Sequence, residues 1–136
     1  MNYMNEALKE ARKAYEKNEV PVGAIIVKNG KILARAHNLK ETKHLPTAHA
    51  EILAIEKACK KIGNWRLEDC EMYVTLKPCK MCEKVISEAR IKHIYYGSKD
   101  RLINEIVNNN YTFIESGECS QILKEFFKKL REDKHN

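Results

Sequence analysis

Apolar residues recur at three- and four-residue spacing along the first part of the chain. Within residues 3–17 this stripe consists of Met4, Ala7, Leu8, Ala11, Ala14 and Tyr15. An α-helix places residues at this spacing on one face, so the pattern predicts an amphipathic helix. Near the other end, residues 118–131 predict a second such helix, whose inward-facing residues are expected to be Ile122, Leu123, Phe126 and Phe127.

The stretch VPVGAIIVKNGKILARAHN predicts a β-hairpin. Asn29 and Gly30 separate its two apolar halves, and this dipeptide is typical of the tight turns that connect antiparallel strands. Residues 22–27 are nearly all apolar. A strand of this composition is usually buried on both faces, so we expect it in the middle of a sheet.

Helices and strands alternate through the remainder of the chain. A helix is predicted from about residue 48 to residue 61, with Gly63 as its stop. Further strands are predicted at EMYVTL, IKHIYYG and YTFIES, with a helix over residues 79–89 between the first two. This alternation after an opening hairpin predicts one α/β domain, residues 1–136, in which a mixed sheet lies between helices.

Composition agrees with a globular protein and bears on its location. Hydrophobic residues make up 43% of the chain and charged residues 32%. No apolar run approaches the roughly 18 residues of a membrane helix, and the N-terminal stretch MNYMNEALKE has no apolar signal core. The odd number of cysteines, five, cannot be fully paired within the chain. We therefore expect a cytoplasmic protein with reduced thiols.

The net charge of +6 is compatible with a polyanionic partner, but a solvated lysine-rich surface also explains it.

Four polar or reactive residues stand at the predicted starts of two helices. His49 and Glu51 lie in the stretch PTAHAEIL, where a helix that only packs against a core would carry neither. Cys79 and Cys82 lie in PCKMC, shortly after a predicted strand. Their three-residue spacing projects both thiols from one side of the first helical turn, and the positive end of the helix dipole favours their thiolate forms.

Two thiolates and one imidazole are a recognised ligand set for zinc. A structural zinc site normally has a fourth protein ligand, whereas a catalytic site leaves that coordination position to water. A carboxylate two residues from the ligand His49 is well placed to move a proton of that water. We therefore predict a catalytic Zn²⁺ held by His49, Cys79 and Cys82, with Glu51 as the acid–base group.

Two other classes of protein remain alternatives on these residues alone. A thiol–disulfide redox protein would use Cys79 and Cys82, but it leaves His49 and Glu51 without a role. A zinc-stabilised binding module would need a fourth protein ligand, for which we find no candidate in the sequence. Zinc stoichiometry and thiol titration on the same sample would separate both from an enzyme.

The combination of His-x-Glu and Pro-Cys-x-x-Cys resembles the signature of the zinc-dependent cytidine and deoxycytidylate deaminase superfamily. The stretches EVPVGAIIV, PTAHAEILAI, RLEDCEMYVTLKPCKMC and EFFKKLR are most similar to its tRNA adenosine deaminase branch, roughly over residues 3–131. The resemblance implies a three-layer α/β/α fold, with a five-stranded mixed sheet and helices on both faces. It also implies a homodimer with one Zn²⁺ per subunit, which converts adenosine to inosine at the wobble position of a tRNA anticodon stem-loop.

Matched position by position, the resemblance implies roles for individual residues. The zinc ligands are His49, Cys79 and Cys82, and Glu51 is the proton-shuttling carboxylate. The residues expected to contact the substrate are Asn38, Ala50, Asp100, Phe126 and Phe127. Asn38 would hydrogen-bond the purine edge, and Asp100 would lie in a loop that touches the neighbouring ribose. One ring of the Phe126–Phe127 pair would line the anticodon site.

The sequence departs from that branch at three places. Lys77 stands where the branch usually has Glu, and Leu45 stands where it commonly has Asp. The stretch RLINEIVNNN is shorter than the corresponding loop and lacks its pattern of Gly, Ala and Ser. Substrate choice depends on loops carried by a rigid scaffold. A zinc-dependent deaminase of a free nucleobase or nucleoside (guanine, cytosine or adenosine) is therefore the alternative within the same chemistry.

Overall fold

Five strands form one mixed sheet in the computed structural model, which describes residues 1–99 and 109–134. The strands are β1 (Gly23–Lys28), β2 (Lys31–His37), β3 (Cys70–Val74), β4 (His93–Tyr96) and β5 (Tyr111–Phe113). Their order in the sheet is β2–β1–β3–β4–β5. β1 is antiparallel to both β2 and β3, whereas β3, β4 and β5 run parallel to one another. The predicted five-stranded mixed sheet is confirmed.

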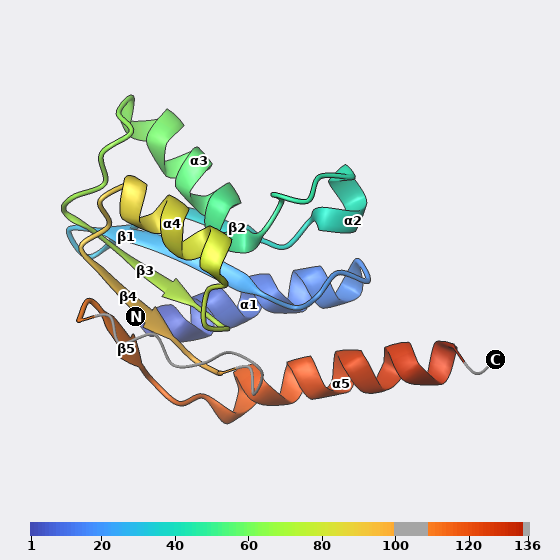
Figure 1. Ribbon diagram of the computed structural model, residues 1–136. Coiled ribbons are helices and arrows are strands. Elements are labelled where there is room, and N and C mark those ends of the chain that lie inside the picture. The colour runs from blue at the N-terminus through green and yellow to red at the C-terminus, as the bar shows by residue number, and fades with distance from the viewer. Residues whose placement is uncertain (100–108, 135–136) are drawn as a thin grey trace.

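Helices cover both faces of this sheet (Figure 1). α3 (Ala50–Ile62) and α4 (Lys80–Glu88) lie on one face, and α1 (Tyr3–Glu16) lies on the other. α5 (Gly117–Asp133) packs beside α1 and extends past the sheet, while the four-residue α2 (Lys40–Lys43) stands in the connection from β2 to α3. The layers are those of the predicted α/β/α fold. Within the described ranges, every helix is too short or too polar to cross a membrane.

The β1–β2 hairpin turns where the sequence predicts it. Asn29 and Gly30 have φ angles of 51° and 73°, the left-handed values that this tight turn requires. The first five residues of β1 are buried, because β2 and β3 flank the strand while α1 and α3 cover its two faces. The central position predicted for residues 22–27 is therefore confirmed.

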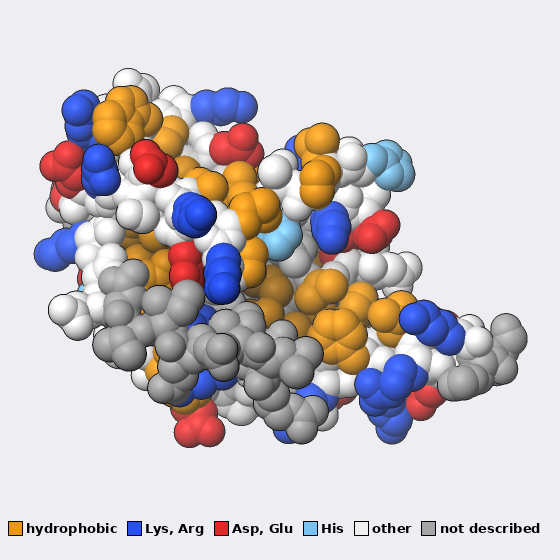
Figure 2. All heavy atoms as spheres, in the orientation of Figure 1, with side chains coloured by type: hydrophobic (Ala, Val, Ile, Leu, Met, Phe, Trp, Pro, Cys, Tyr) orange, Lys and Arg blue, Asp and Glu red, His pale blue; other side chains and the backbone are white. Residues whose placement is uncertain are grey.

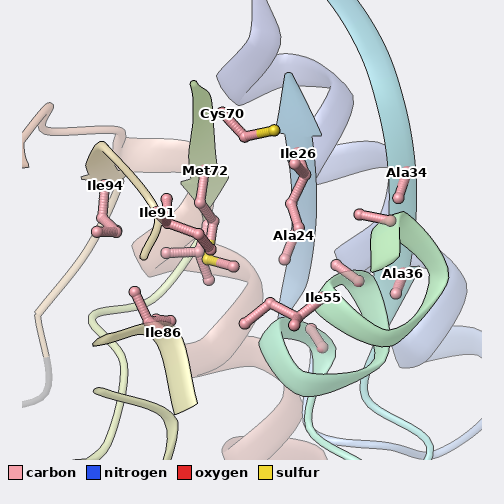
Figure 3. Close-up of a cluster of buried hydrophobic side chains, with 14 of the residues drawn as sticks. Ala24, Ile26, Ala34, Ala36, Ile55, Cys70, Met72, Ile86, Ile91 and Ile94 are labelled. Atoms are coloured by element: carbon pink, nitrogen blue, oxygen red, sulfur yellow. The ribbon is translucent and has the colours of Figure 1, made fainter. Parts of the chain in front are cut away.

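The larger hydrophobic core lies between the sheet and the layer formed by α3 and α4 (Figure 3). Ile26, Met72 and Ile94 project toward this layer from three neighbouring strands. Ile55 of α3 and Ile86 of α4 meet them from the helix side. Removing these apolar side chains from water fixes both helices on the sheet, and it therefore fixes the starts of the two helices relative to each other.

On the opposite face, β1 approaches the backbone of α1 very closely. A Cβ atom added to Gly23 would lie 2.5 Å from the Ala11 backbone nitrogen and would overlap the Ala7 carbonyl oxygen. Both atoms belong to the backbone of α1, so neither can move aside as the end of a flexible side chain could. Glycine is therefore required at this position for α1 to reach the sheet.

We expect Gly23→Ala to lower the free energy of unfolding by about 3 kcal/mol, because overpacking against rigid backbone pushes α1 away from the sheet. Urea unfolding followed by circular dichroism measures this difference. The matched control is Gly117→Ala at the start of α5, where an added Cβ meets no atom within 4 Å. That control should change stability by less than about 1 kcal/mol. Equal stabilities for the two variants would contradict the close packing of α1.

Two features of the helices differ from the sequence-based expectations. The prediction that Phe127 faces inward is wrong, because Phe127 is 42% exposed, whereas Phe126 packs on Tyr15 of α1 with 6.1 Å between ring centroids. A helix turns by about 100° per residue, so two neighbouring rings cannot both face α1. The sequence pattern also does not predict α2, whose residues are polar and carry no apolar stripe.

Candidate metal centre

The starts of α3 and α4 lie close together at one end of the helix layer (Figure 1). His49 is the N-cap residue of α3, and Cys79 is the N-cap residue of α4. Neither side chain caps its own helix, so both are free to point between the two helices. Asn38, just after β2, fixes the first turn of α3 because its Oδ1 atom accepts a hydrogen bond of 2.7 Å from the Ala50 backbone N–H.

Three side chains from these helix starts form a compact cluster of donor atoms. One ligand atom from each of His49, Cys79 and Cys82 lies within 4.8 Å of the other two. The His49 Nδ1 atom is 3.5 Å from the Cys82 Sγ atom and 3.9 Å from the Cys79 Sγ atom. Cys82 is buried, and the other two residues are half-buried. The structure thus brings together the three side chains that the sequence predicts as zinc ligands.

The protonation of this cluster fits a divalent metal ion. Burial lowers the pKa of His49, and the positive charge of Lys40 lowers it further, so the imidazole stays in the neutral form that binds metals. Burial, and then the nearby Glu51 and Cys79, raise the pKa of the Cys82 thiol. A buried thiol in this setting ionises when a cation compensates its charge. Zn²⁺ provides that compensation and prefers this set of nitrogen and sulfur ligands, so the residues present fit zinc.

Glu51 lies beside the cluster without belonging to it. It is 4% exposed, and its carboxyl group hydrogen-bonds with the Cys82 thiol. Burial raises the pKa of Glu51 to about 7, against the opposing effect of hydrogen bonds from its own backbone N–H and from Cys82. Its Oε1 atom is buried and has no hydrogen-bond partner among the described residues. Buried polar atoms are almost always satisfied, so this oxygen is expected to bind water or a substrate atom.

The ligand count separates the classes of protein that the sequence leaves open. Within residues 1–99 and 109–134, no fourth His, Cys, Asp or Glu joins the cluster. Three protein ligands are typical of catalytic zinc sites, whereas a structural site has four. A redox use of Cys79 and Cys82 would give no role to His49, whose Nδ1 atom lies 3.5 Å from the Cys82 Sγ atom, or to the buried Glu51. The site therefore favours an enzyme over a zinc-stabilised module or a redox protein.

The site opens onto a hollow in the protein surface. Figure 2 shows this hollow between α2, the starts of α3 and α4, and the hydrophobic side chains along α5. Lys77, one of the departures from the family pattern, is buried just before α4, and its positive charge opposes the rise that burial causes in the pKa of Glu83. Leu45, another departure, is exposed in the segment that follows α2. Lys77 thus lies next to the start of α4, whereas Leu45 lies in the exposed connection that leads to α3.

The other residues assigned by the resemblance occupy different environments. Ala50 is fully buried and uses its N–H to hold Asn38, which is half-buried. Phe126 packs against α1 away from solvent, while Phe127 faces outward on α5. Asp100 lies outside the described residues. Their contacts with substrate stay predictions.

The fold and the site together define a class of protein. A mixed sheet between helix layers, a His/Cys/Cys zinc set at two helix starts and a neighbouring glutamate that is not a ligand characterise the zinc-dependent deaminases of the cytidine-deaminase-like superfamily. Comparison with known proteins places the sequence more narrowly. The chain belongs to the MafB19-like deaminase family, whose sequence profile matches residues 1–131.

Three known proteins illustrate the similarity. The tRNA-specific adenosine deaminase of Bacillus subtilis is 45% identical over 146 residues, which cover 97% of this chain and 91% of that protein. A solved structure from a study of A-to-I editing by tRNA:A34 deaminases is 48% identical, with a TM-score of 0.71 over 72% of this chain and 75% of that one. The solved guanine deaminase of Bacillus subtilis is 39% identical, with a TM-score of 0.69 over 73% of this chain and 66% of that one.

One buried charged residue near α2 has no role in the sequence-based assignment. Glu19 is 1% exposed, and its carboxylate accepts hydrogen bonds from Glu41 and Thr42. The signal in the sequence was a single acidic residue directly before an apolar strand. Such a position is rarely buried unless the charge has partners, but the sequence could not identify those partners 22 and 23 residues away.

Proposed function

We propose that this chain catalyses the hydrolytic deamination of adenosine to inosine at the wobble position of tRNA, in the cytoplasm. The arrangement that supports the chemistry is a buried glutamate with a free carboxyl oxygen beside a three-ligand zinc set. The support for the substrate is the 45% identity to a tRNA-specific adenosine deaminase along nearly the whole chain. By the same resemblance, we propose that two copies of the chain form a homodimer.

Glu51 is the proposed acid–base group of this reaction. When it is bound by His49, Cys79 and Cys82, Zn²⁺ acts as a Lewis acid that lowers the pKa of water toward about 7. The Glu51 carboxylate takes a proton from the water that attacks C6 of adenine and delivers it to the ring nitrogen. It then takes the proton of the new C6 hydroxyl and gives it to the amino group, so that the C6–N bond breaks and the products are inosine and ammonia.

Asn38 is the proposed residue that orients the purine. Its Oδ1 atom is engaged by the Ala50 N–H, which fixes the plane of the amide group. Among the described residues its side-chain NH₂ group donates to no partner, so its two donors are available for an acceptor on the purine edge. Phe127 is the more accessible ring of the aromatic pair for contact with a base, since Phe126 is buried. Asp100 is proposed to contact the neighbouring ribose.

Deamination of free guanine is the second candidate function. The observation that favours it is the 39% identity to the guanine deaminase of Bacillus subtilis. The same zinc site and glutamate would serve that reaction, because an amine on a purine ring is again replaced by the oxygen of water. The two candidates differ in whether the substrate is part of an RNA strand, and therefore in what the rim of the site must recognise.

The experiment that separates them measures ammonia release from guanine, cytosine, adenosine and an anticodon stem-loop with adenosine at the wobble position. We expect turnover of the stem-loop alone. Its binding should weaken about tenfold when salt rises from roughly 50 to 200 mM, because a few phosphate contacts displace counterions from a single strand. A stem-loop with guanosine at that position is the matched control. Rapid turnover of guanine without turnover of the stem-loop would contradict the tRNA function.

A further inference from the structure

The connection from β2 to α3 is exposed along its whole middle section. All eight residues from 40 to 47 are exposed, so this section contributes no side chain to either core. Hydrogen bonds fix its two ends. The Leu39 N–H donates to the Ala48 carbonyl oxygen at 2.9 Å, and the Ala50 N–H donates to the Asn38 side chain at 2.7 Å. Without packing, the middle section depends on polar contacts for a defined position.

One buried carboxylate supplies those contacts. Glu19 accepts hydrogen bonds from the Glu41 N–H at 3.0 Å, the Thr42 N–H at 2.6 Å and the Thr42 hydroxyl at 2.7 Å. Within the described residues, these three are the only hydrogen bonds that link residues 40–47 to a residue outside the connection, which spans residues 38–49. Burial acts to raise the pKa of Glu19, but the hydrogen bonds from Thr42 and Glu41 outweigh it and lower the pKa, so the group is a carboxylate at neutral pH.

The section that Glu19 holds lies beside the active site. α2 borders the surface hollow at the starts of α3 and α4 (Figure 2). The chain then leads within a few residues to the zinc ligand His49, and Lys40 of α2 is close enough for its charge to affect that imidazole. Residues 40–47 therefore form one side of the approach to the metal ligands.

We propose that Glu19 is a positioning residue, which holds residues 40–47 as a fixed wall of the substrate entrance and so strengthens binding of an RNA strand without acting in the chemical step. This inference rests on the proposed function for the nature of the substrate. Apparent affinity falls in proportion to the fraction of molecules whose binding surface is correctly placed. Releasing the wall should consequently raise KM for RNA and leave kcat nearly unchanged.

The test compares three variants with the zinc-loaded wild-type enzyme, using the anticodon stem-loop as substrate. Glu19→Ala removes the acceptor of all three hydrogen bonds, and we expect KM to rise about tenfold while kcat changes less than about twofold. Thr42→Val removes only the hydroxyl donor and should raise KM about threefold. Thr42→Ser keeps the hydroxyl and is the matched control, so its KM should equal that of the wild type.

A second measurement reports on the wall without substrate. Hydrogen exchange of the Glu41 and Thr42 amides should be faster in Glu19→Ala than in the wild type, while the zinc content stays at one equivalent. If Glu19→Ala does not fold, the Thr42→Val and Thr42→Ser pair carries the test on its own, because Thr42 is exposed and its replacement leaves the core intact.

The outcomes distinguish the two proposals. A wild-type enzyme that neither binds nor deaminates the stem-loop contradicts the proposed function before any variant is compared. A wild type that does deaminate it, combined with equal KM values for Thr42→Val and Thr42→Ser, overturns the role of Glu19 alone. A fall in kcat together with loss of zinc in these variants would also overturn it, because Glu19 would then support the metal centre rather than the entrance.

Discussion

Replacing Glu51 by glutamine is expected to lower kcat by about 10²–10⁴-fold, the usual contribution of a general acid–base group. Glutamine has nearly the same shape but cannot take up the proton of the attacking water. The zinc content should stay at one equivalent, because Glu51 lies outside the His49, Cys79 and Cys82 donor set. Single-turnover kinetics combined with metal analysis of the same sample measures both quantities.

The control for this experiment is Glu56→Gln, which removes an exposed carboxyl group five residues further along the same helix. It should leave kcat and zinc content unchanged. A zinc-loaded Glu51→Gln enzyme that deaminates at nearly the wild-type rate would exclude Glu51 as the proton carrier. Loss of zinc in that variant would instead show that the carboxyl group supports the metal ligands.

Cys79→Ser should lose both zinc and stability. Binding of a ligand to the folded state alone stabilises it by about 3–4 kcal/mol at free concentrations of roughly 100–1,000 times the dissociation constant. We therefore expect the free energy of unfolding of the variant to be lower than that of the zinc-loaded wild type by about 3–4 kcal/mol. A chelator should destabilise the wild type to a similar extent and have little further effect on the variant.

Cys59→Ser is the matched control for the loss of a thiol. Cys59 is half-buried on α3 and lies outside the donor cluster, with its Sγ atom 3.7 Å from the Trp65 carbonyl oxygen. Its replacement should leave the zinc content intact and change the response to chelator little. A full equivalent of zinc in Cys79→Ser would show that the ligand set is wrong.

The sequence predicts those parts of this structure that depend on residues close to one another along the chain. The Asn29–Gly30 turn requires positive φ at two neighbouring residues, and few other residue pairs allow it. The sequence likewise predicts the zinc ligands, because the apolar pattern locates the starts of two helices. A thiol pair lies at one of these starts and a His-x-Glu at the other. The structure then adds what spacing cannot provide, namely that the two helix starts lie next to each other.

Features that depend on distant contacts escape the sequence. Phe126 and Phe127 are the same type of residue at neighbouring positions. Only the placement of α1 decides which of the two rings is buried. The same holds for Glu19, since its partners Glu41 and Thr42 show no pattern that points back to it. Ala50 is a further example, because nothing in the sequence indicates that its N–H is occupied by Asn38.

The absence of core side chains in residues 40–47 affects how such an enzyme can change. This section is held only by hydrogen bonds at its two ends and by the Glu19 carboxylate. Most of its side chains can therefore be replaced with little effect on the free energy of unfolding. Substitutions in this short stretch can therefore change the substrate selectivity of related enzymes while the zinc site stays the same. Grafting the equivalent stretch between relatives is, for the same reason, a practical route to altered selectivity.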